Sequence, residues 1–132
     1  MEAMTHGATT RFYQPAEGFL RLSRSQIGEI RRLYGLLHAF LAEQPEAEAR
    51  LIIVVKRGKV RFGEVELPAG NIPRRGLGQM PDALLLQIDA MLSSLCGFTE
   101  QVGGEARLVL AFSTRSAVRM RMVLSHELAP VR

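Results

Sequence analysis

The sequence predicts a single α+β domain, in which a mostly antiparallel sheet of four or five strands packs against two helices. Two long apolar stripes at helical spacing, two pairs of β-rich runs and their order α-β-β-α-β-β support this fold class. The length of 132 residues and the hydrophobic content of 47% fit one domain with a sizeable core. We expect residues 1–22 to form an extended or partly disordered lead-in and residues 23–132 to form the domain.

The first helix has a clear start and a clear end in the sequence. Ser23 and Gln26 have the spacing of a capping box, which predicts that the helix begins at Arg24. Apolar residues then recur at helical spacing as far as Leu41, and Pro45 ends the run. The predicted helix therefore buries one broad face.

A hairpin and a long loop follow this helix. Residues 51–55 are apolar on both faces of the pleat, which predicts an interior strand covered on both sides. The turn 56–59 leads to a second strand over 60–67, and the change of apolar phase at Gly63 predicts a β-bulge there. Residues 68–80 contain too much proline and glycine for a regular element, so we expect a loop.

The second helix and second hairpin complete the domain. Pro81 is expected at the first helical position, with Asp82 beside the positive end of the helix dipole. Gly97 is typical of the residue just beyond a helix end. Strands are then expected over 107–113 and 117–125, and the last one alternates between apolar and basic residues.

A short sequence repeat coincides with this order of elements. Glu-Ala-Arg-Leu occurs at 48–51 and again at 105–108, each time after a helix and at the start of a hairpin. The repeat is consistent with an internal αββ duplication. Alternatively, two strands with similar sequence preferences at their first residues would share these four residues without a duplication. Both explanations stay open.

Composition excludes several classes of protein. No apolar run approaches the roughly 18 residues of a membrane span, and the N-terminal residues lack the pattern of a secretory signal, so we expect a cytoplasmic protein. One cysteine, Cys96, excludes an intramolecular disulfide and a cysteine-based zinc site within one chain. All but two of the 17 basic residues are arginine, which we attribute to the codon usage of a GC-rich bacterial genome.

The net charge of +4 is concentrated on the hairpins. Lys59 and Arg61, like Arg119 and Arg121, are two residues apart and so share a pleat face. If both strands expose the same sheet face, these residues would form a basic strip that could neutralise phosphates. The alternative is an ordinary solvated face. The candidate partner- or phosphate-binding residues are Lys56, Arg57, Lys59, Arg61, Arg74, Arg75, Arg119 and Arg121.

Two of these cations lie in the loop 68–80. Glycines and the adjacent Arg74 and Arg75 precede a helix N-terminus, an arrangement suited to an anion. The spacing matches neither a P-loop nor a dinucleotide-binding fingerprint. A mobile connector is the alternative interpretation.

No catalytic constellation follows from the residue spacing. His38 flanks the apolar stripe of the first helix and is expected to be packed or half-exposed, while His6 and His126 lie near the chain ends. Cys96, at the end of an apolar helix, is expected to be a small buried hydrophobe. Glu64 and Glu66 share a strand face, where cross-strand ion pairs are a simpler use than acid catalysis. We therefore expect no catalytic residue, metal ligand or cofactor.

Apolar surface points instead to association. The apolar face of the first helix is wider than a single packing seam, and Met120 and Met122 lie on the last strand. A small sheet leaves part of this apolar surface uncovered, which favours self-association. We expect a small non-enzymatic bacterial interaction or regulatory module, a homodimer that binds a protein partner. The alternative is a nucleic-acid-binding protein that uses the basic hairpin surface.

Overall fold

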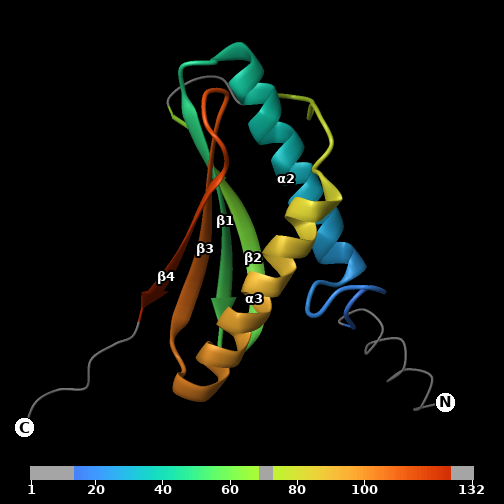
Figure 1. Cartoon of the computed structure of the whole chain (residues 1–132), viewed down its shortest axis with the longest axis vertical. Coiled ribbons are helices and arrows are strands. Elements are labelled where there is room, and N and C mark those ends of the chain that lie inside the picture. The colour runs from blue at the N-terminus through green and yellow to red at the C-terminus, as the bar shows by residue number, and fades with distance from the viewer. Residues whose placement is uncertain (1–13, 69–72, 126–132) are drawn as a thin grey trace, which may run out of the picture.

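The computed structural model describes residues 14–68 and 73–125, apart from the side chain of Phe62 (Figure 1). The predicted α+β fold and its order of elements are confirmed. The elements are helix α2 (Arg24–Glu43), strands β1 (Glu48–Lys56) and β2 (Lys59–Glu66), helix α3 (Asp82–Val102), and strands β3 (Glu105–Ser113) and β4 (Arg119–Ser125).

The sheet has four strands in the order β2-β1-β3-β4, and every neighbouring pair is antiparallel. β1 and β3 form the centre and pair along their whole length, from Glu48 opposite Ser113 to Lys56 opposite Glu105. The two hairpins therefore lie side by side, and their second strands, β2 and β4, become the opposite edges of the sheet.

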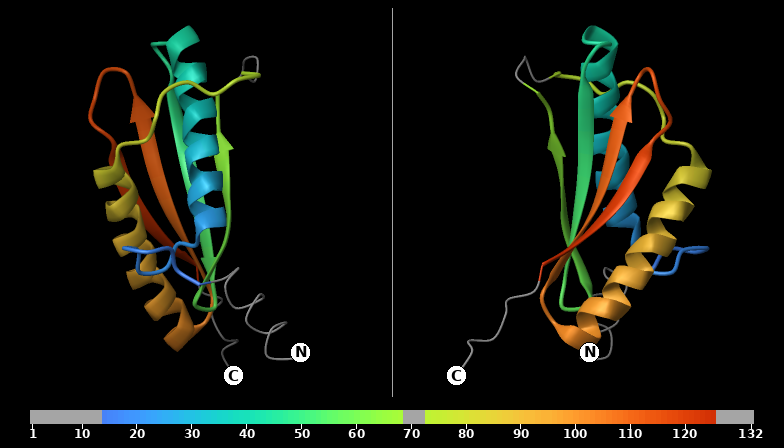
Figure 2. Two further views of the ribbon diagram at one scale, coloured as in Figure 1. Left: turned by 90° about the vertical axis from the view of Figure 1, so that its right-hand side faces the viewer. Right: turned by 60° about the vertical axis from the view of Figure 1, so that its left-hand side comes forward.

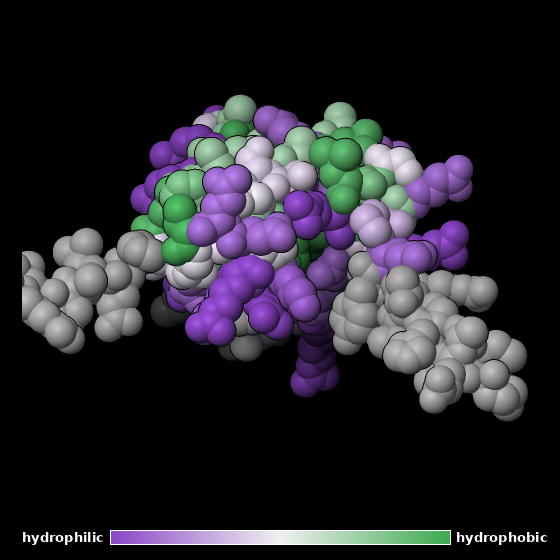
Figure 3. Space-filling view, turned by 90° about the horizontal axis from the view of Figure 1, so that it is seen from below, coloured by the Kyte–Doolittle hydropathy of each residue, from purple (hydrophilic) through white to green (hydrophobic). Residues whose placement is uncertain are grey.

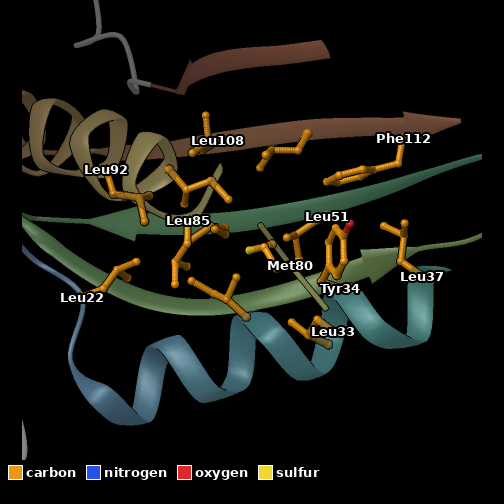
Figure 4. Close-up of a cluster of buried hydrophobic side chains, with 14 of the residues drawn as sticks. Leu22, Leu33, Tyr34, Leu37, Leu51, Met80, Leu85, Leu92, Leu108 and Phe112 are labelled. Atoms are coloured by element: carbon orange, nitrogen blue, oxygen red, sulfur yellow. The ribbon is translucent and has the colours of Figure 1, made fainter. Parts of the chain in front are cut away.

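Both helices cover the same face of the sheet, with α2 over β1 and β2 and α3 mainly over β1 and β3 (Figure 2). Alternate residues of β1, among them Leu51, Ile53 and Val55, point toward the helices and are fully buried. Leu85 and Leu92 of α3 complete this core from the helix side (Figure 4). The core is thus a single layer between one sheet face and two helices.

No described element covers the other face of the sheet, which we call the open face. Ile52, Val54 and Val109 on this face are nevertheless only 6%, 1% and 7% exposed. Longer side chains flank them, since Glu64 is paired with Ile52 and Arg121 with Val109. The first strand is therefore an interior strand buried on both faces, as predicted, and side chains of the sheet itself, not a second layer of elements, bury its second face.

The capping box that opens α2 is confirmed. The Ser23 hydroxyl accepts a hydrogen bond from the Gln26 backbone N–H at 3.2 Å, and the Gln26 side-chain oxygen accepts one from the Ser23 N–H at 2.9 Å. The Gln26 side-chain amide also donates to the Val60 carbonyl at 3.3 Å. Gln26 therefore completes the cap at the start of α2 and also joins this end of the helix to strand β2.

The bulge in β2 lies two residues before the predicted position. The register shifts opposite Val54 and Val55, between Val60 and Phe62, so Arg61 is the unpaired residue. Gly63 is instead paired regularly with Ile53, below α2. A Cβ atom at Gly63 would lie 3.1 Å from Cδ1 of Leu33, so glycine there permits a close approach of the helix.

Helix α3 is longer than predicted. The helix does not end at Gly97 but continues to Val102, and Gly103 with φ +73° ends it. The buried Thr99 hydroxyl accepts from the Gly58 N–H and donates to the Leu95 carbonyl, both at 2.9 Å, which fixes the last turns to the β1–β2 turn. A tertiary contact therefore outweighs the weak helix propensity of Gly97.

The start of α3 also differs slightly from the prediction. Pro81 is the N-cap residue, one position before the expected one, and its ψ of 137° is extended. Asp82 occupies the first turn as expected.

The described part of the lead-in, residues 14–22, is attached to α3. Asp89 is 2% exposed, and its carboxylate accepts hydrogen bonds from the backbone N–H groups of Leu20, Arg21 and Leu22 at 2.6, 3.0 and 3.0 Å. The Leu22 side chain is fully buried. The expectation for residues 1–13 lies outside the described residues.

Candidate interaction surfaces

The structure divides the eight predicted binding cations among three places. Lys56, Arg57, Lys59 and Arg61 surround the β1–β2 turn, whereas Arg119 and Arg121 lie on strand β4. Since β1 and β3 separate β2 from β4, the two pairs with two-residue spacing do not form one continuous basic strip. The remaining two cations, in the loop that crosses the helix layer, are Arg74 and Arg75.

The open face has a charge gradient across the strands. Glu64 and Glu66 lie toward the β2 edge, and Arg119 and Arg121 lie toward the β4 edge. The Arg50 guanidinium lies 3.2 Å from the Glu66 carboxylate, and Arg119 lies 2.6 Å from Glu48. These exposed ion pairs confirm a cross-strand role for Glu66 and contribute little to stability individually.

The described part of the loop is fixed to α2. The Leu77 N–H donates to the Gly35 carbonyl at 2.9 Å, and a Cβ atom on Gly76 would lie 3.1 Å from the Gly35 backbone. Met80 is 2% exposed. The loop therefore lies directly on the helix and holds Arg74 and Arg75 exposed to solvent.

His38 and Cys96 have packing roles. The His38 ring lies 4.2 Å from the Tyr34 ring, centre to centre, and burial lowers the pKa of His38 below its ordinary value of 6.5. Cys96 is 1% exposed, and burial raises the pKa of its thiol, as expected for a small core residue. Within residues 14–68 and 73–125, no cluster of three or more His, Cys, Asp or Glu residues could hold a metal ion. His6 and His126 lie outside the described residues.

An exposed apolar surface runs along α3 and β4. Neither helix packs extensively on β4, so Met122 and Leu124, which point to the helix side, are 50% and 51% exposed. Phe98 and Val102 on α3 are 45% and 46% exposed. We call this region the α3–β4 apolar surface, and its residues are Leu84, Met91, Phe98, Val102, Met120, Met122 and Leu124.

The α3 members of this surface lie on one side of the helix, because they follow one another at intervals of seven, seven and four residues. Asp82 and Asp89 lie on the opposite side, where they contact Arg31 of α2 and the chain that leads into α2. The apolar side of α3 therefore faces the β4 edge. The alternation of Met120 and Met122 with arginines was the sequence signal for the strand half of this surface.

A cleft lies at the other edge of the molecule, between the start of α2 and strand β2. Its volume is about 750 Å³, and its polar lining includes Arg21, Lys59, Arg61, Ser25 and Gln26. Figure 3 views this end of the molecule, where hydrophilic side chains lie between hydrophobic patches. The sequence indicated Lys59 and Arg61 but not Arg21, because no local pattern relates the lead-in to β2.

Comparison of the chain with protein-family models, with curated proteins and with solved structures found no match to any of them. None of the helices in the described ranges combines the length and the apolar character needed to cross a membrane.

Proposed function

We propose that the chain is a non-enzymatic interaction module that forms a homodimer through the α3–β4 apolar surface. The observation that supports this proposal best is the exposure of Phe98, Val102, Met122 and Leu124, each about half open to water on one side of the molecule. Contiguous apolar surface is costly to leave in water and is typical of an interface.

A second copy of the chain fits this surface because β4 is an edge strand of the sheet that residues 14–68 and 73–125 form. Two β4 strands can pair antiparallel about a two-fold axis at Met122, which would extend the sheet across both copies. In that register Met120 would face Leu124 of the other copy on the helix side, and Arg121 would face Val123 on the open face. No two arginines would be directly opposite, so the pairing avoids repulsion between like charges.

The two α3 helices would then lie close together above the paired strands. Their apolar sides both face the β4 edge, so each would cover the exposed methionine and leucine side chains of the joined strands. A helix of 21 residues is about 30 Å long, which allows an extended contact. The dimer would leave the open face and the β1–β2 end accessible to a protein partner.

The nucleic-acid alternative has less support. Its eight cations are divided among three places, and Arg119 already contacts Glu48. A phosphate backbone binds best to cations that lie along one continuous path. The distribution of these cations therefore favours a protein interaction module over a nucleic-acid-binding protein.

The oligomeric state tests the proposal directly. We expect sedimentation equilibrium of the full chain to give a mass of twice 14.6 kDa, and Met122→Glu to give the monomer mass because it places two carboxylates across the axis. Arg24→Glu is the control, since it introduces a carboxylate at an exposed residue of α2, which packs over β1 and β2 and not beside β4, and it should stay dimeric. A wild-type chain that is monomeric at all concentrations, or a control that dissociates as Met122→Glu does, would contradict the proposal.

Fluorescence anisotropy with single- and double-stranded DNA and RNA separates the two candidate functions. We expect the chain to show no nucleic-acid binding whose affinity falls steeply as the salt concentration rises from about 50 to 200 mM. Steeply salt-dependent binding that is lost in Arg119→Ala/Arg121→Ala would instead favour the nucleic-acid function.

A further inference from the structure

The cleft beside α2 brings together three cations from distant parts of the sequence. Arg21 comes from the chain before α2, Lys59 from the start of β2, and Arg61 from the bulge. The three side chains are exposed, and none has a carboxylate within 4.0 Å among residues 14–68 and 73–125. Like charges repel one another, so this concentration of positive charge is unfavourable for the chain alone.

The β-bulge explains why Arg61 contributes to the cleft. In a regular strand, neighbouring residues point to opposite faces, whereas the unpaired Arg61 has no partner on β1. Its neighbour Val60 lines the cleft as well, and the Gln26 amide holds the Val60 carbonyl at 3.3 Å. The bulge and the start of α2 are therefore joined by a direct hydrogen bond that fixes the cleft wall.

Two acidic groups near the cleft are already engaged, whereas Glu100, whose side chain lies against Gly58, has no ion pair among the described residues. Glu29 lines an adjoining hollow but accepts two hydrogen bonds from Arg32, at 2.6 and 3.1 Å. Asp89 lies behind the cleft residues Leu20 and Arg21, and its carboxylate accepts hydrogen bonds from the backbone N–H groups of residues 20–22. Neither carboxylate is available to neutralise the cations of the cleft.

The lining also has an apolar part. Leu20 and Val60 contribute to the cleft, and the adjoining hollow of about 250 Å³ continues over Ile30 and Ile53 toward Gly63. Ser25, at the first turn of α2, adds a hydroxyl, and the helix N-terminus adds a weak positive potential. The cleft therefore offers a cationic end and an apolar end.

We propose that this cleft binds a phosphorylated small molecule, whose phosphate lies among Arg21, Lys59 and Arg61 and whose less polar body lies over Val60 and Ile30. Guanidinium groups match phosphate oxygens in charge and geometry, and a lysine ammonium adds a compact positive charge. The cleft is on the α2–β2 edge, away from the α3–β4 apolar surface, so the proposal does not depend on dimer formation.

Titration calorimetry of the full chain with ADP, pyrophosphate and adenosine tests the proposal. We expect saturable binding of ADP and pyrophosphate and at least tenfold weaker binding of adenosine, because adenosine lacks the phosphates. Lys59→Gln and Arg61→Gln should each weaken ADP binding about tenfold, since each removes one charge-assisted contact. Both residues are exposed on the surface, so thermal unfolding of the variants should match that of the wild type.

Arg119→Gln/Arg121→Gln is the matched control, because it removes two cations from the far edge of the sheet. This double variant should bind ADP with the affinity of the wild type. Met122→Glu should also bind ADP with the wild-type affinity. The proposal is overturned if neither ADP nor pyrophosphate binds saturably, if adenosine binds as tightly as ADP, or if the control loses as much affinity as Arg61→Gln.

Discussion

Ile52 and Val109 are paired across the two central strands, and each lies four positions after the glutamate of its own Glu-Ala-Arg-Leu segment. The antiparallel register therefore places the two segments at opposite ends of the strand pair, at equal distance from this one contact. A helix precedes and a hairpin strand follows each segment, in the same order on both sides. This is the relationship that an internal αββ duplication would produce, and the duplication stays a prediction.

The contact between Ile52 and Val109 on the open face should contribute less to the free energy of unfolding than a contact in the core beneath the helices. Ile52→Ala should lower the free energy of unfolding by about 2 kcal/mol, because only flanking side chains enclose the site and they can partly close around the gap. Leu108→Ala, in the core covered by the helices, should cost about 4 kcal/mol. Urea denaturation measures both, and equal losses would indicate that another layer covers the open face in solution.

Asp89 should be essential for the attachment of the lead-in. Asp89→Ala leaves three N–H groups without their acceptor, so we expect a loss of about 3 kcal/mol of stability and faster hydrogen exchange at Leu20 and Leu22. Asp82→Ala on the same helix is the control. Asp82 is largely exposed and has one ion pair at 3.6 Å, so its removal should cost less than about 1 kcal/mol. Similar losses in both variants would contradict this role for Asp89.

Two glycines of α2 should respond in opposite ways to alanine. Gly28→Ala should raise stability by about 0.5–1 kcal/mol, because a Cβ atom there contacts nothing within 4 Å and alanine favours the helix. Gly35→Ala should lower stability by about 1 kcal/mol, because its Cβ would lie 3.3 Å from the Gly76 backbone. Thermal or chemical denaturation distinguishes them, and a stabilised Gly35→Ala would show that the loop does not lie on α2.

His38 should make the domain less stable in mild acid. Burial lowers its pKa in the folded state below 6.5, so the unfolded chain binds the proton more readily. The free energy of unfolding should fall as the pH drops from 6.5 through the folded-state pKa, and His38→Gln should lack this component. An NMR titration of the His38 ring gives the pKa directly. A value at or above 6.5 would contradict the packing described for this ring.

The sequence by itself predicted the elements of this protein because their signals are local. The capping box of Ser23 and Gln26, the helical spacing of apolar residues and the alternation along β4 each depend on neighbours within a few positions. The buried state of Cys96 followed from similar reasoning. The roles predicted for Gly63 and Gly97 were wrong, because they depend on contacts across the fold that leave no trace in the local pattern. Leu33 packs closely on Gly63, and the hydrogen bond from Gly58 to Thr99 holds the helix beyond Gly97.

Only the tertiary structure decided which surfaces exist. Strand order placed β2 and β4 at opposite edges, which separated the two pairs of cations that local spacing made equivalent. The same order left Met122 and Leu124 beyond the cover of the helices. Arg21, Lys59 and Arg61 came together because Asp89 holds the lead-in and a bulge interrupts β2. Strand order and long-range hydrogen bonds depend on residues tens of positions apart, whereas the sequence pattern reports only on the neighbourhood of each residue.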